Sequence, residues 1–394
     1  MKQSKTYLKA FKFRIYPKGD QVTHLANNFG CCRYVFNKVL ELRQKAFKEE
    51  GKSLSYFDTT KILPVLKRQE ETKWLGKAMS QPLQMAAKNV DSAFKNFFSK
   101  KAKYPKFKCK NSRQCIKIQQ GFRVEEDLLY IPKLKTGIKI NLSREIKGKI
   151  LYLHISKSTT GKYYASFTCE VPREQYDKTG NAVGVDVGIK ESCILSSGKK
   201  YANIHALKKL ENKVKYEQRR LSIKQKGSNS SRKQRLKIAR LHERIRQLRE
   251  TCLHNISSDI IKNNDIIITE DLSVKNLMQN HCIAKALSDA SLGKLLTQLE
   301  YKSEWYGRTF AKVDRFFPSS KTCSACGAIK QDLKLSDRNW TCTTCHHQHD
   351  RDVNAAINIL NEGLKKLSGL VTKPDIKQKW DEASSLEESE NPDA

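Results

Sequence analysis

The sequence predicts a multidomain chain with a small helical bundle, a compact β-barrel or sheet, and an α/β domain into which a metal ribbon is inserted. Three observations predict this architecture. Apolar and polar residues alternate near the amino terminus and again over residues 115–171, as in strands with one buried face. Helical apolar spacing fills the stretch between these regions. From residue 183, short apolar strands alternate with long helices, and two Cys-x-x-Cys motifs interrupt this pattern.

Composition favours a nucleic acid as the partner. The 394 residues contain 75 Lys plus Arg against 41 Asp plus Glu, a net charge of +34 that attracts polyanions in a salt-dependent way. A basic housekeeping protein such as a ribosomal component carries similar charge, so charge alone does not decide the function. At roughly 150 residues per domain, the chain holds two or three domains.

The chain is expected to be cytoplasmic and to have no membrane partner. Its first ten residues lack the apolar core of a signal peptide, and no stretch approaches the run of about 20 apolar residues that crosses a bilayer. Of the 12 cysteines, four have metal-ligand spacing, and the other eight are expected to be reduced and mostly buried.

The first 180 residues are expected to form two domains. Residues 7–16 alternate as a strand, and helical stripes run from Asp20 and over 79–98, with 54–75 as the middle element. Short alternating runs return after residue 115 and can be joined by the first strand. The expected boundaries are 1–16 with 111–180 for the β-barrel and 17–110 for the helical lobe.

A basic segment ends the helical lobe. Residues 99–110 interleave lysines with two aromatic rings and a proline. Such a segment can follow a phosphate backbone while its rings stack on bases, and Lys103, Tyr104 and Lys106 are the candidate contacts. A solvated basic linker is an equally good interpretation for any single residue.

Two long helices are expected to form a hairpin in the third region. Apolar residues repeat in a heptad pattern on both sides of a Gly- and Ser-rich break at 227–231. Basic residues far outnumber acidic ones on the other faces, whereas exposed flanks of a coiled coil usually mix both signs. This imbalance favours contact with a phosphate backbone, and the candidate residues include Arg219, Arg220, Arg240 and Arg244.

Three acidic residues stand at the ends of elements in the α/β region. Asp186 lies in the strand that starts at Val183, Glu270 follows the strand 265–269, and Asp352 opens the last helix. Mg²⁺ prefers oxygen ligands, and converging carboxylates repel one another without a cation, so the acids predict a site for Mg²⁺ or Mn²⁺. Two such ions would activate a water and stabilise the leaving oxygen in phosphodiester cleavage.

Two of these assignments stay open. Asp271 competes with Glu270, because strand alternation points neighbouring side chains to opposite faces. Asp350 competes with Asp352, although it could instead cap the final helix. Asp186 lies in an apolar strand, where a structural carboxylate would need a buried partner.

The order of strands and helices, with acids on the first strand, a later strand and the terminal helix, predicts an RNase H-like α/β fold. A helix over 287–306 and a strand over 309–313 belong to this pattern. The tail is rich in Glu and Ser and is expected to be disordered. The expected boundaries are 181–317 with 347–363 for the nuclease domain, 318–346 for the ribbon and 364–394 for the acidic tail.

Two Cys-x-x-Cys pairs, separated by fifteen residues, predict a structural Zn²⁺ site. Its four thiolates leave no open position for water. Three histidines just beyond could replace a cysteine or bind phosphate. The predicted ligands are Cys323, Cys326, Cys342 and Cys345, and the histidines are His346, His347 and His349.

Four motifs closely resemble the TnpB family of transposon-encoded proteins, which are relatives of type V CRISPR nucleases. They are Gly-Val-Asp-Val-Gly-Ile-Lys around Asp186, Ile-Thr-Glu-Asp-Leu around Glu270, Pro-Ser-Ser-Lys-Thr-Cys-Ser-Ala-Cys-Gly over 318–327, and Asp-Arg-Asp-Val-Asn-Ala-Ala-Ile-Asn-Ile-Leu over 350–360. Motifs such as Lys-Phe-Arg-Ile-Tyr-Pro near the amino terminus extend the resemblance over nearly the whole chain.

The resemblance implies an RNA-guided DNA endonuclease with a wedge-type β-barrel, a helical recognition lobe and a RuvC nuclease domain that carries a zinc ribbon. A guide RNA from the transposon end would pair with one strand of a double-stranded DNA target, next to a short recognised motif. Lys77 and Gln81 fall one helical turn apart where family members contact that motif. Strand transfer would be left to a separate transposase encoded by the same element.

Two other functions remain open. A transposase that joins DNA ends itself would use the same carboxylates, because RNase H-like folds support both hydrolysis and strand transfer. A non-catalytic DNA-binding regulator would use the acids for folding alone. All three family acids are present, so nothing in the sequence favours an inactive regulator.

Overall fold

The computed structural model describes residues 6–334 and 336–371 and divides into two compact units. Unit 1 is Met1–Pro172, and unit 2 is Arg173–Ala394. No helix in the described ranges is long and apolar enough to cross a membrane. The first five residues of the predicted β-barrel, and the acidic tail beyond residue 371, lie outside the described residues.

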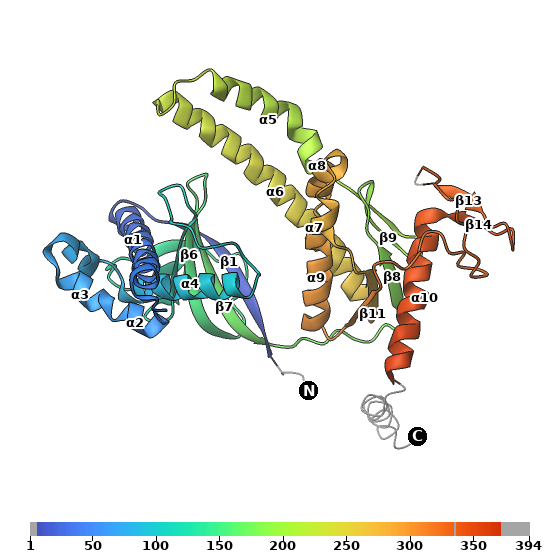
Figure 1. Cartoon of the computed structure of the whole chain (residues 1–394), viewed down its shortest axis with the longest axis horizontal. Coiled ribbons are helices and arrows are strands. Elements are labelled where there is room, and N and C mark those ends of the chain that lie inside the picture. Colours follow the sequence, from blue (N-terminus) through green and yellow to red (C-terminus); the bar gives the residue numbers. More distant parts are fainter. Residues whose placement is uncertain (1–5, 335, 372–394) are drawn as a thin grey trace, which may run out of the picture. The chain divides into compact units, whose positions relative to one another are not determined.

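Unit 1 contains a seven-stranded antiparallel sheet (Figure 1). Its order is β2-β6-β7-β1-β5-β4-β3, so the strand that the alternation over 7–16 predicted joins this sheet and lies at its centre. The order ends at two edges, so the described sheet is a curled half-barrel and not a closed barrel. The strands are β1 (Thr6–Tyr16), β2 (Gln114–Ile118), β3 (Arg123–Glu125), β4 (Leu128–Tyr130), β5 (Ile138–Asn141), β6 (Lys149–Lys157) and β7 (Tyr163–Pro172).

The helices of unit 1 share one apolar core. Val39 of α1 and both Leu83 and Val90 of α4 are almost fully buried in it. The predicted middle element 54–75 is wrong as a single helix, because Gln69 has an extended backbone between two short helical pieces. The helices are α1 (Asp20–Glu50), α2 (Tyr56–Thr60), α3 (Ile62–Arg68), the 3-10 helix η1 (Glu70–Lys77) and α4 (Ser80–Phe98).

Unit 2 is built on a five-stranded mixed sheet of order β10-β9-β8-β11-β12. Strands β8, β9 and β10 form an antiparallel meander, whereas β11 and β12 run parallel to β8. The central strands are apolar on both sides because helices cover both faces of the sheet. The strands are β8 (Ala182–Asp186), β9 (Glu191–Leu195), β10 (Lys200–Ala202), β11 (Ile266–Glu270) and β12 (Thr309–Val313).

Two helical layers sandwich this sheet (Figure 1). On one face, Ile260 of α6 and Leu299 of α9 pack with Val183 and Ile267. On the other face, Ile359 of α10 packs with Ile268. The helices are α5 (Ala206–Ser222), α6 (Asn229–Asn263), α7 (Val274–Leu277), α8 (His281–Ala290), α9 (Leu292–Trp305) and α10 (Arg351–Val371).

Two predicted boundaries in unit 2 are wrong. The helix predicted over 287–306 is divided between α8 and α9, because Ser291 has a left-handed backbone with φ of 55°. Helix α10 continues to the end of the described residues, so 364–371 are helical although they were expected to be disordered. Leu364 and Leu367 pack against the apolar cluster on this face of the sheet, which explains the longer helix.

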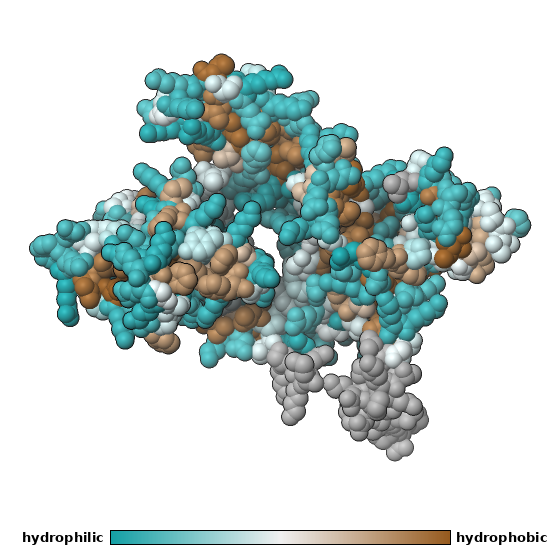
Figure 2. All heavy atoms as spheres, in the orientation of Figure 1, coloured by the Kyte–Doolittle hydropathy of each residue, from teal (hydrophilic) through white to brown (hydrophobic). Residues whose placement is uncertain are grey.

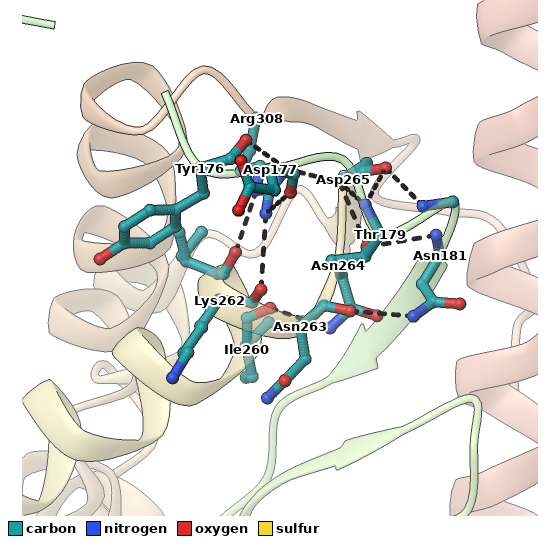
Figure 3. A network of polar contacts seen from close by, with 12 residues as sticks. Tyr176, Asp177, Thr179, Asn181, Ile260, Lys262, Asn263, Asn264, Asp265 and Arg308 are labelled. Carbon is teal, nitrogen blue, oxygen red and sulfur yellow. Dashed lines mark hydrogen bonds and ion pairs between the residues drawn. The ribbon is translucent and has the colours of Figure 1, made fainter. Parts of the chain in front are cut away.

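A polar network around Arg308 holds the segment that leads into β8 (Figure 3). The buried guanidinium donates to the carbonyl oxygens of Ile261 at 3.2 Å and Asp177 at 2.9 Å. It also pairs with Asp265 at 2.5 Å, and that carboxylate accepts a hydrogen bond from the backbone N–H of Thr179 at 2.9 Å. These contacts fix the amino-terminal ends of β8 and β11, at the edge of the sheet opposite their carboxyl ends.

Candidate active site and metal ribbon

The structure brings Asp186 and Glu270 together at the carboxyl edge of the unit 2 sheet. Strands β8 and β11 are parallel neighbours, and their register pairs Val185 with Thr269. Asp186 and Glu270 are the next residues on the two strands, so they lie side by side. Ile268 packs on the α10 side of the sheet. Since Glu270 is two residues further along the strand, its side chain leaves the same face.

Asp352 reaches the same edge from α10. The helix lies so close to β8 that a Cβ atom on Gly184 would be 2.0 Å from the carbonyl oxygen of Ala356. Gly184 therefore faces α10, and so does Asp186, two residues further along β8. Asp352 precedes Ala356 by about one helical turn, and its negative charge acts on Asp186.

Burial and mutual repulsion perturb these carboxyl groups. Desolvation, followed by the charges of Glu270 and Asp352, raises the pKa of Asp186 to about 7, while Arg351 opposes the shift. Burial also raises the pKa of Glu270, against the hydrogen bond from Ser319. Carboxyl groups that retain protons because they are buried together are typical of functional sites.

Glu270, the last residue of β11, and Asp271, which follows the strand, have different surroundings. Glu270 is partly buried, and its carboxylate accepts a hydrogen bond from the Ser319 hydroxyl. Asp271 is instead paired with the Arg315 guanidinium at 2.7 Å, and half of its side chain is exposed. The sequence left both acids open, and the structure groups Glu270 with Asp186.

Asp350 and Asp352 also have different partners. The Asp350 carboxylate accepts hydrogen bonds from the backbone N–H groups of Asp352 at 3.0 Å and Val353 at 3.2 Å, which is a helix-capping arrangement. It also pairs with Lys200 at 2.5 Å. Asp352 accepts two hydrogen bonds from Arg338 of the ribbon, at 2.8 and 3.1 Å.

The four predicted cysteine ligands meet in one cluster. Their Sγ atoms all lie within 4.8 Å of one another, a donor set that fits Zn²⁺. In the described ranges, no other group of three or more His, Cys, Asp or Glu side chains has its ligand atoms this close, so the three carboxylates are more widely spread. The ribbon extends beyond its predicted end through the hairpin of β13 (Asn339–Thr341) and β14 (Gln348–Asp350).

One of the three histidines contacts this cluster. The Nε2 atom of His349 is 3.0 Å from the Sγ atom of Cys323, and its ring lies 4.6 Å from that of Trp340. His349 is buried, whereas His346 and His347 are exposed. A ring N–H at this position can donate to a thiolate and orient it without replacing it.

Two buried asparagines tie the ribbon to α10. Asn354 donates to the carbonyl oxygen of Thr322 at 2.7 Å and accepts from the backbone N–H of Ser324 at 2.9 Å. Asn358 donates to the carbonyl oxygen of Ser319 at 2.7 Å. Sequence reasoning missed this pair. The signal that could have found it is the four-residue spacing, which places both asparagines on one face of an otherwise apolar helix.

The two candidate contacts near the start of α4 do not share a helix. Lys77 ends η1, and the extended backbone of Ala78 and Met79 separates it from Gln81, so the predicted one-turn spacing is wrong. Lys77 is exposed. The side-chain oxygen of Gln81 accepts hydrogen bonds from the backbone N–H groups of Gln119 at 2.9 Å and Gln120 at 3.1 Å.

The basic segment after α4 is partly anchored. The ring of Tyr104 packs edge-on against Phe94 and Phe97, with centroids 5.7 and 5.2 Å apart. Tyr104 therefore contributes to the packing of unit 1, although 46% of its surface stays exposed. Lys103 and Lys106 are exposed on either side of it.

The predicted hairpin of unit 2 forms from α5 and α6. Val214 and Ile245 are buried between the two helices. Hydrophilic side chains gather over much of the face of the hairpin that Figure 2 shows. All four candidate arginines are exposed, namely Arg219, Arg220, Arg240 and Arg244.

Three family models match parts of the chain. They are described as "Helix-turn-helix domain" over residues 6–52, "Probable transposase" over residues 166–281 and "Cas12f1-like, TNB domain" over residues 293–359. The first range contains β1 and one long helix, α1, so the structure does not form a helix-turn-helix there.

Relatives match the chain over most of its length. A Streptomyces pristinaespiralis protein named "Putative RNA-guided DNA endonuclease" is 39% identical over 90% of this chain and 89% of its own. An Escherichia coli (strain K12) protein named "Putative RNA-guided DNA endonuclease InsQ" is 30% identical over 90% of this chain and 92% of its own. A solved Cas12f1–sgRNA–target DNA complex has a similar fold, with a TM-score of 0.57, 14% identity and coverage of 91% of this chain and 99% of that chain.

Proposed function

The chain belongs to the TnpB family of RNA-guided DNA endonucleases, and on this premise we propose that it cleaves DNA under the direction of a bound RNA. The proposed catalytic residues are Asp186, Glu270 and Asp352. The observation that carries the proposal is the placement of Asp186 beside Glu270 on parallel strands, with Asp352 approaching from α10.

We assign unit 2 to an RNase H-like nuclease domain of the RuvC type. The order β10-β9-β8-β11-β12, with the first three strands antiparallel and the last two parallel to β8, supports this assignment. A fold of this kind hosts several chemistries, so the assignment of cleavage depends on the carboxylates and on the family.

The three carboxylates would hold Mg²⁺ or Mn²⁺, since they offer hard oxygen donors around a buried acid whose pKa is raised. When bound, such ions supply the charge that activates a water and stabilises the leaving oxygen. The hydroxyl of Ser319 orients Glu270, and Arg338 holds Asp352. The four cysteines would hold a structural Zn²⁺, which keeps the ribbon folded around Ser319 and Arg338.

The nucleic-acid partners follow from the same family. A guide RNA from the transposon end would pair with one strand of double-stranded DNA, and exposed cations of both units would contact the phosphate backbones. Unit 1 would supply the wedge, formed by its curled sheet, and the recognition lobe, formed by its helices. We also predict that the protein acts in the cytoplasm and that the same element encodes a separate transposase.

Two alternatives predict different results. A strand-transfer transposase would join DNA ends in the absence of a guide, and a DNA-binding regulator would bind DNA without cutting it. The names of the relatives favour neither. Sequencing the RNA that co-purifies with the protein distinguishes a strand-transfer transposase from a guided nuclease. A defined transcript from the end of the element is expected only for the guided nuclease.

The decisive variant is Asp186→Asn, which keeps the shape of the side chain and removes its charge. A DNA target is designed to match the co-purified RNA, and cleavage is measured with Mg²⁺ present. We expect the wild-type protein to cut this target, and Asp186→Asn to bind the same RNA and DNA without cutting. Unchanged cleavage by this variant would refute the proposal.

A further inference from the structure

The loop that joins β12 to the ribbon presents an aromatic ring to solvent. Phe316 is 88% exposed, the largest value among the exposed large apolar side chains of the described residues. The next residue, Phe317, packs instead against the cluster of Ile268 and Val313. Single exposed apolar side chains are common, so exposure alone assigns nothing to Phe316.

Hydrogen bonds fix the loop 314–319 on both sides of this ring. Arg315 donates to the Asp271 carboxylate at 2.7 Å and to its carbonyl oxygen at 3.0 Å. The backbone N–H of Phe316 donates to the Asp314 carboxylate at 2.9 Å, and the backbone N–H of Ser319 donates to the Phe317 carbonyl oxygen at 2.8 Å. Hydrogen bonds therefore hold the backbone on both sides of the exposed ring.

This loop lies next to Glu270 of the carboxylate site. Its first end leaves β12 where Val313 is paired with Glu270 in the sheet. Its second end reaches back to the same acid, because the Ser319 hydroxyl donates to the Glu270 carboxylate. Phe316 thus lies on a short loop, and the residues at its two ends, Val313 and Ser319, both contact Glu270.

The ring also lines an open hollow that contains both cationic and acidic side chains. Lys312, Arg315 and Lys366 line this hollow with Phe316, and so do the acids Asp271 and Asp314. Lys312 pairs with Glu300 at 3.2 Å, and Lys366 lies 3.8 Å from the Glu362 carboxylate. Arg315 is paired in turn with Asp271, so the hollow offers a nucleic acid the exposed ring and not an unpaired positive charge. Aromatic rings bind single strands because unpaired bases stack on them.

We propose that Phe316 is a stacking platform for an unpaired base of the DNA strand that is presented to the carboxylates. This proposal rests on the proposed nuclease function, and it adds a requirement for single-stranded DNA at this edge. Stacking on a ring accepts any base, so the platform would position the strand without reading its sequence. Phe316 would act as a positioning residue, and the carboxylates would carry the chemistry.

The test compares a single-stranded DNA with an abasic strand of the same length, both bound to the full-length protein in buffer without magnesium or manganese. Phe316→Ala is expected to weaken binding of the base-containing strand by about 5- to 150-fold and to leave the abasic strand unaffected, as loss of one stacked base predicts. Phe316→Trp should retain the preference for bases. Phe47→Ala removes another exposed phenyl ring, on α1, and serves as the matched control.

A second measurement locates the base. A strand that contains 4-thiothymidine is crosslinked by light, and the modified peptide is identified by mass spectrometry; we expect the adduct at Phe316 in the wild-type protein and its loss in Phe316→Ala. An equal drop for both strands, no drop, or an adduct only elsewhere would overturn the proposal. If the wild-type protein cuts no DNA, the proposed function fails separately, and the crosslink still decides whether Phe316 meets a base.

Discussion

Gly184 and Ala356 are in such close contact that no side chain fits between them. A Cβ atom on Gly184 would lie 2.0 Å from the carbonyl oxygen of Ala356 and 2.7 Å from the backbone nitrogen of Leu360. The contact brings the backbone of α10 onto β8 at the place where Asp352 can act on Asp186. The geometry of the carboxylate site thus depends on a residue that has no functional group.

The first prediction concerns this contact. Gly184→Ala forces the helix away from the strand, so we expect the free energy of unfolding to fall by about 1–3 kcal/mol and DNA cleavage to fall with it. Thermal unfolding and cleavage assays measure both effects. Gly30→Ala is the control, because Gly30 lies within α1 with no atom near its Cβ position and the same change should stabilise by up to about 1 kcal/mol.

The second prediction separates neighbouring acids. Glu270→Gln and Asp352→Asn should each reduce cleavage by about 100-fold or more with nucleic-acid binding retained, since each removes a charge that faces Asp186. The controls are Asp271→Asn and Asp350→Asn, which change acids that are paired with Arg315 and Lys200. A loss of cleavage as large in the controls as in the test variants would contradict the assignment.

The third prediction concerns pH. Burial and the charges of Glu270 and Asp352 raise the pKa of Asp186 from 3.8 to about 7, so between these values the folded protein keeps a proton that the unfolded chain has released. The free energy of unfolding should therefore fall as pH rises through this window, by at most about 1.4 kcal/mol per pH unit. Melting curves of the protein free of magnesium and manganese measure this trend.

Asp186→Asn provides the comparison for the same experiment. The variant lacks the titrating group, so the difference in melting temperature between it and the wild-type protein should grow in favour of the variant from about pH 4 to about pH 7. Added Mg²⁺ should stabilise the wild-type protein more than the variant. A difference that does not change with pH would show that Asp186 ionises normally in the folded protein.

The fourth prediction concerns the ribbon. Cys342→Ser removes one of four clustered sulfurs, so we expect the purified protein to lose its zinc, about one ion per chain, and the ribbon to exchange its amide hydrogens faster. Elemental analysis and hydrogen-exchange mass spectrometry measure these changes. Cys282→Ser is the matched control, since Cys282 is an exposed cysteine of α8 outside the cluster.

The fifth prediction concerns the hairpin. Replacing Arg219, Arg220, Arg240 and Arg244 together by alanine should weaken duplex binding and reduce the slope of log affinity against log salt by up to about 3 to 4 units. The double variant Lys45→Ala and Lys73→Ala removes exposed cations that already pair with glutamates, and it should change the slope much less. Equal slopes in the wild-type and hairpin variants would exclude the hairpin from phosphate contact.

Local patterns predicted much of the fold. The alternation over residues 7–16 gave a strand, the heptads gave the hairpin of α5 and α6, and the cysteine spacing gave a cluster of four sulfurs. The failures lie where a single backbone conformation interrupts a pattern, as at Gln69 and Ser291. A left-handed or extended residue leaves the apolar spacing on both sides unchanged, so spacing cannot reveal it.

The sequence by itself determined which side chains are available for chemistry, because strand and helix periods and the spacing of ligands are properties of neighbouring residues. The tertiary structure alone decided which acid of each competing pair faces Asp186, and how Asn354 and Asn358 hold the ribbon. Those choices depend on the approach of α10 to β8, a contact between segments that are far apart in the chain and come together only when the sheet is covered.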